Sequence, residues 1–384
     1  RFFNYPLEAT NALRNLGLVK ATHCVLSYLK QRVKPSETRD TFESWVVNRF
    51  GRQLFEIFFK SYSEKLWGIP CDQLNSDFAA QRIKKLSLGE AIKNALGFGG
   101  KHQTLVDQFA YPLMGTGQVY DRMAAYVNVL GRVNLSAPVR RVLMDNAKVK
   151  GLELMDGKSY AFDHVISTMP LTLLVKGIEG IPGHVKEAAS ALKFRNTVLV
   201  YLNVDGTDLF PDQWIYVHAP ELKMGRVTNF RNWLPSLYGN SKTSILALEY
   251  WCNDNDPDWQ SDDNEWIETA KHEMRSTGLI GETPILDGHV LRIHRSYPVY
   301  AQNYREHLQV VTDHMNQYDG LTAIGRYGAF KYNNQDHSIL MGLLAADNLL
   351  TEHQNNLWSI NTDYETYQEA ATITAAGLVT AGAT

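Results

Sequence analysis

The chain has 384 residues, of which 44% are hydrophobic and 21% are charged. This length predicts two or three domains or one large one, with enough apolar material for a buried core. Lysine and arginine number 38 against 41 aspartates and glutamates, which gives a formal net charge of −3. A dedicated nucleic-acid binder usually carries a strong basic bias. The balance therefore argues against a nucleic-acid partner.

Three isolated cysteines and the absence of a long apolar run exclude further classes of protein. No CxxC pair occurs, which excludes a zinc ribbon or a thioredoxin-type motif. A sparse, odd cysteine count is typical of a reducing compartment, so we expect a cytoplasmic protein. No uninterrupted apolar stretch approaches the ~18–20 residues of a membrane span. The acidic stretch 254–265 resembles a calcium loop, but Trp259 stands where that loop needs glycine, so we predict no metal site.

The first third of the chain is predicted to be mainly helical. Asp40, followed three residues later by Glu43, has the pattern of a helix N-cap with its capping partner. Apolar residues recur behind this pair at helical spacing. Helices are predicted, in chain order, over residues 40–62, 87–95 and 118–130.

Strand patterns begin after the third predicted helix. Three runs are joined by Asp-Asn and Asp-Gly turns, which predicts an antiparallel meander. The meander strands are expected over residues 139–144, 148–154 and 158–162. Later strands are expected over 165–168, 197–204, 214–218, 244–251 and 321–324, and later helices over 264–277 and 338–350.

This order interleaves helical and strand segments, which predicts a mixed α/β fold with one domain inserted into another. Two separate segments are predicted to build one α/β layer, with the chain between them forming the insertion. The expected parts are a mainly helical cap or substrate region over 1–133, the α/β layer over 134–170 and 318–350, a mixed substrate-binding domain over 171–317, and an extension over 351–384 whose end is disordered.

The strongest candidate site follows the last predicted strand. Gly325 and Gly328 occupy a turn that leads through a polar loop to a helix N-terminus. Such an end presents unpaired backbone N–H groups and a partial positive charge, both suited to a phosphate. Arg326 could grip a phosphate or a carboxylate in a bidentate fork. A plain helix capped by Asp336 or Ser338 explains the same pattern, and spacing alone leaves both interpretations open.

Other constellations are weaker. The strand that ends at Ser167-Thr168 puts small polar groups at a carboxyl edge, where α/β sheets bind ligands, although this stretch alone favours a simple turn. Three side chains could act as acid or base, but no triad or carboxylate-pair spacing distinguishes them, so the catalytic residues remain unassigned. These three are His294, His337 and Glu249. The 19 tyrosines and 8 tryptophans suit a pocket for a planar ring or a sugar as well as a core.

At the glycine turn the sequence resembles a known family. The run from Gly325 to Gly342, with its GR-x-G turn, aromatic–basic–Tyr step and Asn-Asn-Gln-Asp-His-Ser sequence, is similar to the C-terminal flavin-binding segment of the amine-oxidase and protoporphyrinogen-oxidase superfamily. It is closest to the bacterial branch that also resembles UDP-galactopyranose mutase. Segments 45–88, 163–170 and 297–300 agree, and the resemblance covers nearly all of residues 1–350.

The resemblance implies an FAD-dependent enzyme built on an incomplete Rossmann-like FAD-binding domain, with an inserted substrate domain and a helical block. Segments 134–170 and 318–350 would be parts of the FAD domain. The residues implied to bind the cofactor are Val139, Thr168, Pro170, Gly325, Arg326, Tyr332, Asn334, Gln335, Asp336 and Ser338. The residues implied to face the substrate are Tyr297, Tyr300 and Arg326.

Two reactions are compatible with this resemblance. An oxidoreductase would pass a hydride from a small-molecule substrate to the flavin. A sugar-nucleotide mutase would use reduced flavin as a nucleophile, and Arg326 would then pair with the diphosphate of the substrate. Mutases follow the aromatic–basic–Tyr step with a Tyr/Leu-Asp pair, whereas Asn333-Asn334 stands here, which favours the oxidoreductase. A third alternative is a non-catalytic binding protein that keeps the fold.

One departure from the family concerns the phosphate cradle. The sequence contains no G-x-G-x-x-G followed by an acidic residue, and residues 2–7 resemble a stretch well inside full-length relatives. We therefore expect a fragment that lacks about one α/β unit of the flavin domain. Because those glycines and their helix N-terminus hold the pyrophosphate, we expect weak FAD binding or none.

Overall fold

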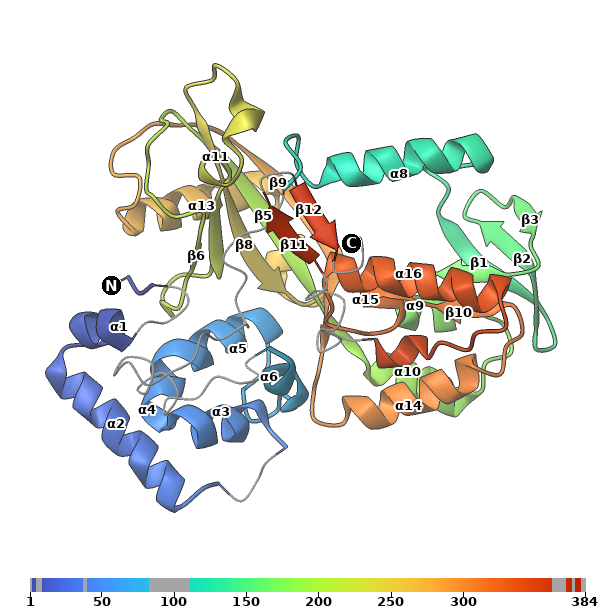
Figure 1. Ribbon diagram of the computed structural model, residues 1–384, viewed down its shortest axis with the longest axis horizontal. Coiled ribbons are helices and arrows are strands. Elements are labelled where there is room, and N and C mark those ends of the chain that lie inside the picture. The colour runs from blue at the N-terminus through green and yellow to red at the C-terminus, as the bar shows by residue number, and fades with distance from the viewer. Residues whose placement is uncertain are drawn as a thin grey trace.

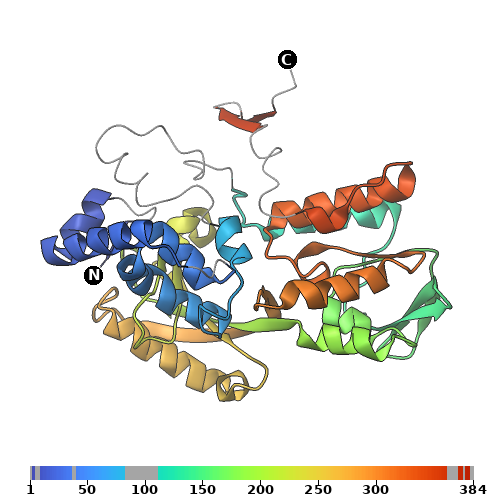
Figure 2. The ribbon, with the colours of Figure 1, turned by 90° about the horizontal axis from the view of Figure 1, so that it is seen from below.

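Two long neighbouring strands, β5 (Lys193–Val204) and β9 (Ile285–Val299), run between the two halves of the structure (Figures 1 and 2). The structure is a computed structural model that describes residues 2–4, 9–36, 40–82, 111–360, 371–374 and 377–380. The predicted helix over 87–95 lies outside these residues. The architecture is mixed α/β, with helices and several separate sheets, as the sequence predicts.

The N-terminal helices form one block beside the larger sheet (Figure 1). Thr41, not Asp40, caps the helix of the predicted 40–62 segment, because its side chain accepts the Ser44 N–H at 3.0 Å. Gly51 interrupts that segment at φ +83°, where a Cβ would lie 2.7 Å from the backbone nitrogen of Tyr28. The elements are α1 (Ala9–Leu16), α2 (Leu18–Val33), α3 (Phe42–Phe50), α4 (Arg52–Phe55), a π-helix (Glu56–Lys60), α5 (Ser61–Trp67) and α6 (Asp77–Arg82).

The largest sheet is antiparallel, with strand order β6-β7-β8-β5-β9. One face packs on α13 (Asp263–Ser276), and their buried side chains form a separate core. The sequence missed β7 and the long edge strand β9, whose glycine and proline weaken a strand signal. The remaining elements of this half are β6 (Trp214–Tyr216), β7 (Arg226–Asn229), α11 (Phe230–Trp233), a 3₁₀ helix (Pro235–Tyr238), β8 (Ser244–Cys252) and α12 (Pro257–Gln260).

The other half contains the predicted antiparallel meander and a parallel pair of strands. The meander has the order β1-β2-β3 and confirms the prediction. The parallel pair joins β4 to β10, with Ile166 opposite Thr322, so two segments far apart in the sequence lie side by side. These strands are β1 (Val139–Asp145), β2 (Lys148–Leu154), β3 (Ser159–Ala161), β4 (Val165–Ser167) and β10 (Leu321–Ala323).

Helices surround the parallel pair, and α8 stands apart from them (Figure 1). The helix α16 begins at residue 335 rather than at the predicted 338, so part of the predicted polar loop is helical. None of the residues of α8 is buried. The elements are α8 (Gly117–Leu130), α9 (Leu171–Lys176), α10 (Gly183–Ala191), α14 (Tyr304–Met315), α15 (Gly325–Gly328), α16 (Gln335–Leu350) and a 3₁₀ helix (Leu357–Ser359).

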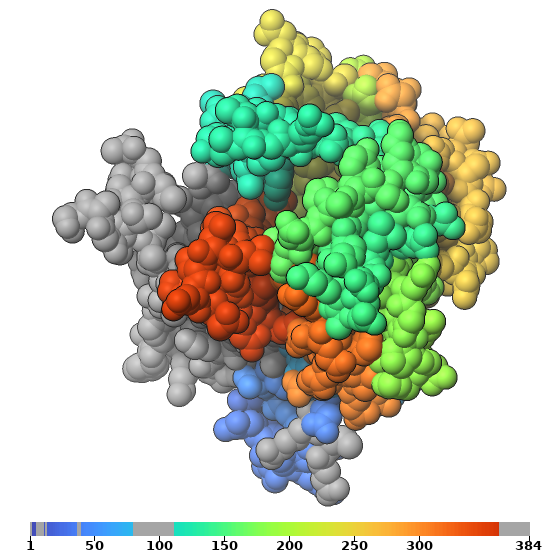
Figure 3. Space-filling model, turned by 90° about the vertical axis from the view of Figure 1, so that its right-hand side faces the viewer, coloured from blue at the N-terminus to red at the C-terminus, as the bar shows by residue number. Residues whose placement is uncertain are grey.

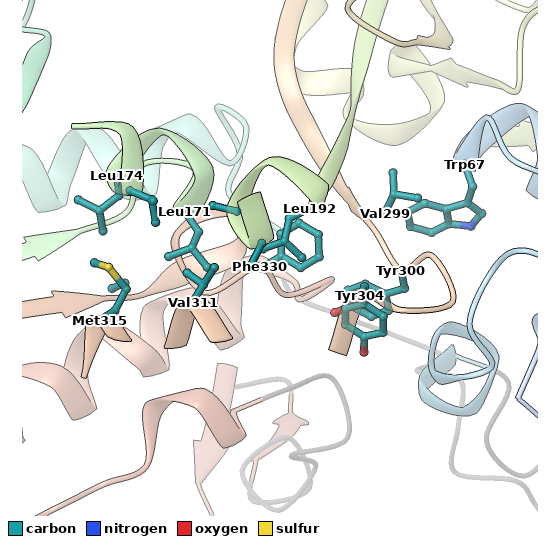
Figure 4. Packing of buried hydrophobic residues seen from close by; sticks show 14 of the residues in the cluster. Trp67, Leu171, Leu174, Leu192, Val299, Tyr300, Tyr304, Val311, Met315 and Phe330 are labelled. Atoms are coloured by element: carbon teal, nitrogen blue, oxygen red, sulfur yellow. The ribbon is translucent and has the colours of Figure 1, made fainter. Parts of the chain in front are cut away.

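The main hydrophobic core is shared by the two halves. It extends from Trp67 in the helical block, through Tyr300 and Phe330, to Leu174 and Met315 in the α/β half (Figure 4). This continuity fixes the helical block against the turn that follows β10.

Two short strands near the end of the chain pair with each other antiparallel, β11 (Ala371–Thr374) with β12 (Gly377–Thr380). The sequence predicted a disordered end there. Among the described residues, no helix has the length and apolar character that crossing a membrane requires.

Candidate functional site

The turn after β10 contains the two glycines of the candidate site, and glycine is needed at each position for a different reason. Gly325 has φ +80°, and a Cβ there would meet nothing nearer than Thr168 at 3.9 Å. A Cβ on Gly328 would lie 2.8 Å from the backbone oxygen of Ser167. Gly325 therefore supplies a left-handed backbone with open space before it, whereas Gly328 lets the turn pack closely on the end of β4.

The N-terminus of α16 is capped by Asn334 rather than by Asp336 or Ser338. The Asn334 side chain accepts the backbone N–H of His337, and the His337 ring accepts the Asn334 N–H at 3.4 Å, which completes a capping box. Asp336 lies in the first turn, where the helix dipole favours a carboxylate. The Ser338 hydroxyl donates at 3.3 Å to the side-chain oxygen of Asn333.

A cavity of about 660 Å³ lies in front of this turn. Figure 3 looks onto this side of the molecule, where α8 stands above α16. The residues that line the cavity come from α8, the end of β4, the glycine turn and the start of α16. They are Tyr120, Thr168, Gly325, Arg326, Tyr327, Asn333, Asn334, Gln335 and Ser338. Most of the residues predicted to bind a cofactor are thus brought together around one cavity.

Four predicted cofactor residues are not among the described residues that line the cavity. Tyr332 stacks on Tyr297 instead. Val139 starts β1 and pairs with Leu154 in the meander. Pro170 precedes the first turn of α9. Asp336 belongs to the first turn of α16, next to lining residues.

Arg326 is held by the protein itself. Its Nε donates to the Ser296 carbonyl at 3.0 Å, and its Nη1 donates to the Asn333 carbonyl at 2.6 Å. Its guanidinium carbon lies 4.7 Å and 4.6 Å from the ring centroids of Tyr297 and Tyr332. This geometry differs from the open fork that the sequence predicted, because two donors are already engaged and two aromatic rings lie against the guanidinium.

The two tyrosines predicted to face a substrate occupy different surroundings. Tyr297 stacks on Tyr332 with a centroid distance of 5.7 Å, and burial raises the pKa of Tyr297, so its hydroxyl stays protonated. Tyr300 is only 1% exposed, and its hydroxyl accepts the Tyr332 N–H at 2.8 Å. Its ring stacks on Tyr304 at 4.3 Å. Tyr300 is thus a core residue that orients Tyr332.

A second polar cluster, which the sequence did not reveal as a site, lies on the large sheet. Arg226 of β7 donates through Nε to Glu249 of β8 at 2.9 Å. Tyr62 of α5 packs against Tyr216 at 5.3 Å and against Trp251 at 5.7 Å. These residues stand on different strands and on α5, so no local sequence signal points to them and only the strand order brings them together.

The remaining acid–base candidates have structural partners. His294 contacts Asp254 at 2.9 Å on the surface. His337 is buried in the capping box of α16. Among the described residues, no group of histidines, cysteines and carboxylates could hold a metal ion.

The cavity residues fit part of a flavin. A volume of about 660 Å³ is in the range of small-molecule and cofactor sites, roughly 300–1,000 Å³. The open space before Gly325 lets a ligand approach the backbone, and amide and hydroxyl side chains surround it. This donor and acceptor set suits the polar part of a flavin nucleotide.

Comparisons with known proteins point to one family. The family described as flavin containing amine oxidoreductase matches residues 29–350. The fold is similar to a crystal structure of reduced UDP-galactopyranose mutase, with TM-score 0.76 and 20% identity over 90% of this chain and 74% of that one.

Two further solved structures are similar in fold. A putative protoporphyrinogen oxidase from Exiguobacterium sp. 255-15 has TM-score 0.59 and 17% identity over 81% of this chain and 68% of that one. A CLA-producing fatty acid isomerase from P. acnes has TM-score 0.53 and 13% identity over 87% and 76%. The family match spans most of the sequence, and the chain therefore belongs to the flavin-containing amine oxidoreductases.

Proposed function

We propose that the protein is an FAD-dependent oxidoreductase that acts on a small-molecule substrate, with the flavin bound at the β10–α16 turn. The observation that carries the proposal is the cavity of about 660 Å³ lined by Gly325, Asn334, Gln335 and Ser338. These residues belong to the segment that resembles the flavin-binding end of the family, and the family match supports a flavin.

Each part of the turn has a defined task in this proposal. Gly325 lets the cofactor approach the backbone, and Thr168 bounds the space from the end of β4. The first turn of α16 offers N–H groups to an anionic or carbonyl oxygen. Asn334, Gln335 and Ser338 add side-chain hydrogen bonds. When bound, FAD would accept a hydride equivalent from the substrate.

The substrate side is assigned to the stacked tyrosines. Arg326 lies against both stacked rings, Tyr297 and Tyr332, and is itself fixed by the Ser296 and Asn333 carbonyls. The protonated hydroxyl of Tyr297 is available as a donor, and the rings exclude water from the reacting region. The proposal assigns 134–170 and 318–350 to the flavin side, and 1–133 and 171–317 to the substrate side.

A flavin titration tests the proposal. The quenching of FAD fluorescence by the purified chain is measured for the wild type, for Asn334→Ala and for Ser338→Ala. We expect weak binding by the wild type, because the sequence has no G-x-G-x-x-G, and a further loss of about fivefold or more in each variant.

Asn355→Ala, at an asparagine away from the glycine turn, is the control and should bind as the wild type does. Equal binding by all four proteins would contradict the proposed site.

A second candidate function is a flavin-dependent sugar-nucleotide isomerase. Its support is the fold similarity to the UDP-galactopyranose mutase structure at TM-score 0.76. Asn333-Asn334 counts against it, as the sequence comparison indicates. Turnover with an electron acceptor supports the oxidoreductase, whereas interconversion of pyranose and furanose forms after dithionite reduction supports the isomerase. If neither activity is found, the third alternative, a non-catalytic binding protein, is left.

A further inference from the structure

The helix α2 of the N-terminal block carries its large apolar residues on the side that faces solvent. It lies along the outer edge of the block, at the lower left of Figure 1. These side chains recur at the spacing that places residues on one face of a helix, whereas a surface helix normally turns such a face toward the core. They form the α2 stripe and are 52–87% exposed: Leu18, Val19, Leu26, Leu29 and Val33.

The opposite face of α2 fixes this orientation. Cys24 is buried there. The Ser27 hydroxyl accepts the Gln53 N–H at 3.2 Å, and the Gln31 amide donates to Asn48 Oδ1 at 2.6 Å. The helix therefore packs on the block through small and polar side chains. Turning the α2 stripe inward would break these contacts, so the stripe is an outward-facing feature of the fold.

The flanks of the α2 stripe are basic. Residues 18–34 contain three lysines, one arginine and no aspartate or glutamate, although the whole chain has a net charge of −3. With 100° of rotation per residue, Lys30 lies on one side of the stripe and Arg32 on the other. All four basic side chains are exposed: Lys20, Lys30, Arg32 and Lys34.

We propose that α2 docks the protein on a membrane surface that contains anionic lipids. An apolar helix face together with lysine and arginine is typical of helices that lie in the interface of a bilayer. The leucines would enter the boundary between headgroups and acyl chains, and the long basic side chains would reach the lipid phosphates beside them. The helix has 16 residues, fewer than the ~20 of a membrane span, and would lie in the plane of the surface.

The charge distribution favours a lipid surface over a second copy of the chain. In a two-fold dimer the same patch meets itself. Lys30 and Arg32 of both copies would then flank one apolar seam, and α2 has no carboxylate to pair with them. Anionic headgroups instead supply negative charge along the whole helix, and each basic residue near such a surface strengthens binding by about fivefold.

A second helix with exposed apolar residues, α8, lacks this combination. It contains Asp121 beside Arg122 and no other charged residue, so its net charge is zero. Its Tyr120 lines the cavity of the proposed flavin site. The exposed end of α8 therefore serves as a matched control for apolar character without basic charge.

Vesicle flotation tests the proposal. The purified chain is mixed with vesicles of phosphatidylcholine alone, or of phosphatidylcholine with phosphatidylserine, and the bound fraction is measured at low and at high salt. We expect the wild type to bind the mixed vesicles about tenfold more strongly than the neutral ones. This preference should shrink at high salt, because salt screens the headgroup charge.

Two double variants separate the apolar and the basic contributions. Leu26→Gln/Leu29→Gln should weaken binding to the mixed vesicles by about tenfold, because it removes the centre of the α2 stripe. Lys30→Gln/Arg32→Gln should weaken the same binding by about tenfold and leave binding to neutral vesicles unchanged. All four side chains are exposed, so both variants should fold, which far-UV circular dichroism checks.

The control is Val129→Gln/Leu130→Gln on α8, where both side chains are 78% exposed, and it should bind as the wild type does. Three results would overturn the proposal: no binding of the wild type to mixed vesicles, unchanged binding by folded Leu26→Gln/Leu29→Gln, or an equal loss in the control. Sedimentation velocity without vesicles tests the second copy. A dimer that dissociates only in Leu26→Gln/Leu29→Gln would assign the stripe to the chain itself and overturn the lipid surface.

Discussion

The glycine turn and the charged row on the large sheet are built in opposite ways. Residues 325–338 supply most of the lining of the cavity from one continuous segment. The row takes Tyr62 from α5, Tyr216 from β6, Arg226 from β7 and Glu249 from β8. The first depends on local backbone geometry, whereas the second exists only when the helical block is held against the sheet.

Different forces consequently maintain the two regions. The turn depends on glycine conformations and on a capping box within a few residues of each other. The row depends on long-range anchors between α5 and the sheet. Arg195 of β5 is such an anchor, since it is 4% exposed and donates to the carbonyls of Leu66 and Trp251. Substitutions can therefore damage one region and spare the other.

The largest effect is expected from Arg195→Met. Its guanidinium also bonds the Lys65 carbonyl and Asp256, so the substitution leaves several buried acceptors without their donor. We expect a loss of about 3–5 kcal/mol in the free energy of unfolding, measured by urea denaturation.

Hydrogen exchange separates the two regions in this variant. Exchange should rise in α5 and in β8, while exchange in α16 stays unchanged. Arg292, a partly buried arginine on the neighbouring strand β9 that pairs with Asp263, provides the control Arg292→Met. Uniform loss of protection across both regions would show that Arg195 does not act through the anchor.

A smaller effect, confined to the turn, is expected from Gly328→Ala. The new Cβ would lie 2.8 Å from the Ser167 oxygen and 3.3 Å from the Thr168 Cα, and both neighbours are backbone atoms. Moving the turn away from β4 should cost about 1–3 kcal/mol and weaken FAD binding. Gly183→Ala, where a Cβ would meet nothing within 4 Å, is the matched control.

Protection of the α5 and β8 amides from hydrogen exchange should survive in Gly328→Ala. If that variant loses this protection as strongly as it loses FAD binding, the two regions are not independent, and the contrast between them fails.

The contrast also explains how far the sequence could predict the site. The glycine turn is local, so its glycines, helix and polar side chains were found, although Asn334 was overlooked as the cap in favour of Asp336 and Ser338. Tyr297 and Tyr300 could not be told apart, because only the packed core shows that Tyr300 is buried.

The charged row required information that the sequence does not hold locally. Glu249 was one of three acid–base candidates, but its partner Arg226 lies on β7, a strand that the sequence did not predict. The strand order β6-β7-β8 brings the partners together. Long-range pairing of this kind follows from the register of the whole sheet.

The smallest expected effects are changes in stability with pH, and they should concern the row alone. They arise from Lys65 and His218, two groups at the connection between β6 and β7. Lys65 donates to the carbonyls of Val217, Ala219 and Met224, and burial lowers its pKa to about 8, although Glu273 and Glu221 oppose this. Burial, with the Lys65 charge as a second cause, lowers the pKa of His218 to about 4.

The signs of the two contributions follow from linkage. Between pH 4 and 6.5 the unfolded chain binds a proton at His218 that the folded chain does not, so stability should fall as the pH falls through this window. Between pH 8 and 10.5 the unfolded chain holds a proton that folded Lys65 has lost, so stability should rise with pH. Urea denaturation at a series of pH values measures both slopes.

Each slope should disappear in its own variant. His218→Gln should flatten the acid window and Lys65→Met the alkaline one, while Lys271→Met, on the exposed side of α13, should change neither. Flavin binding at the turn should follow neither slope, because both groups lie on the connection that joins the helical block to the sheet. A parallel pH dependence of flavin binding would show that the turn senses this connection, and the two regions would then form one cooperative unit.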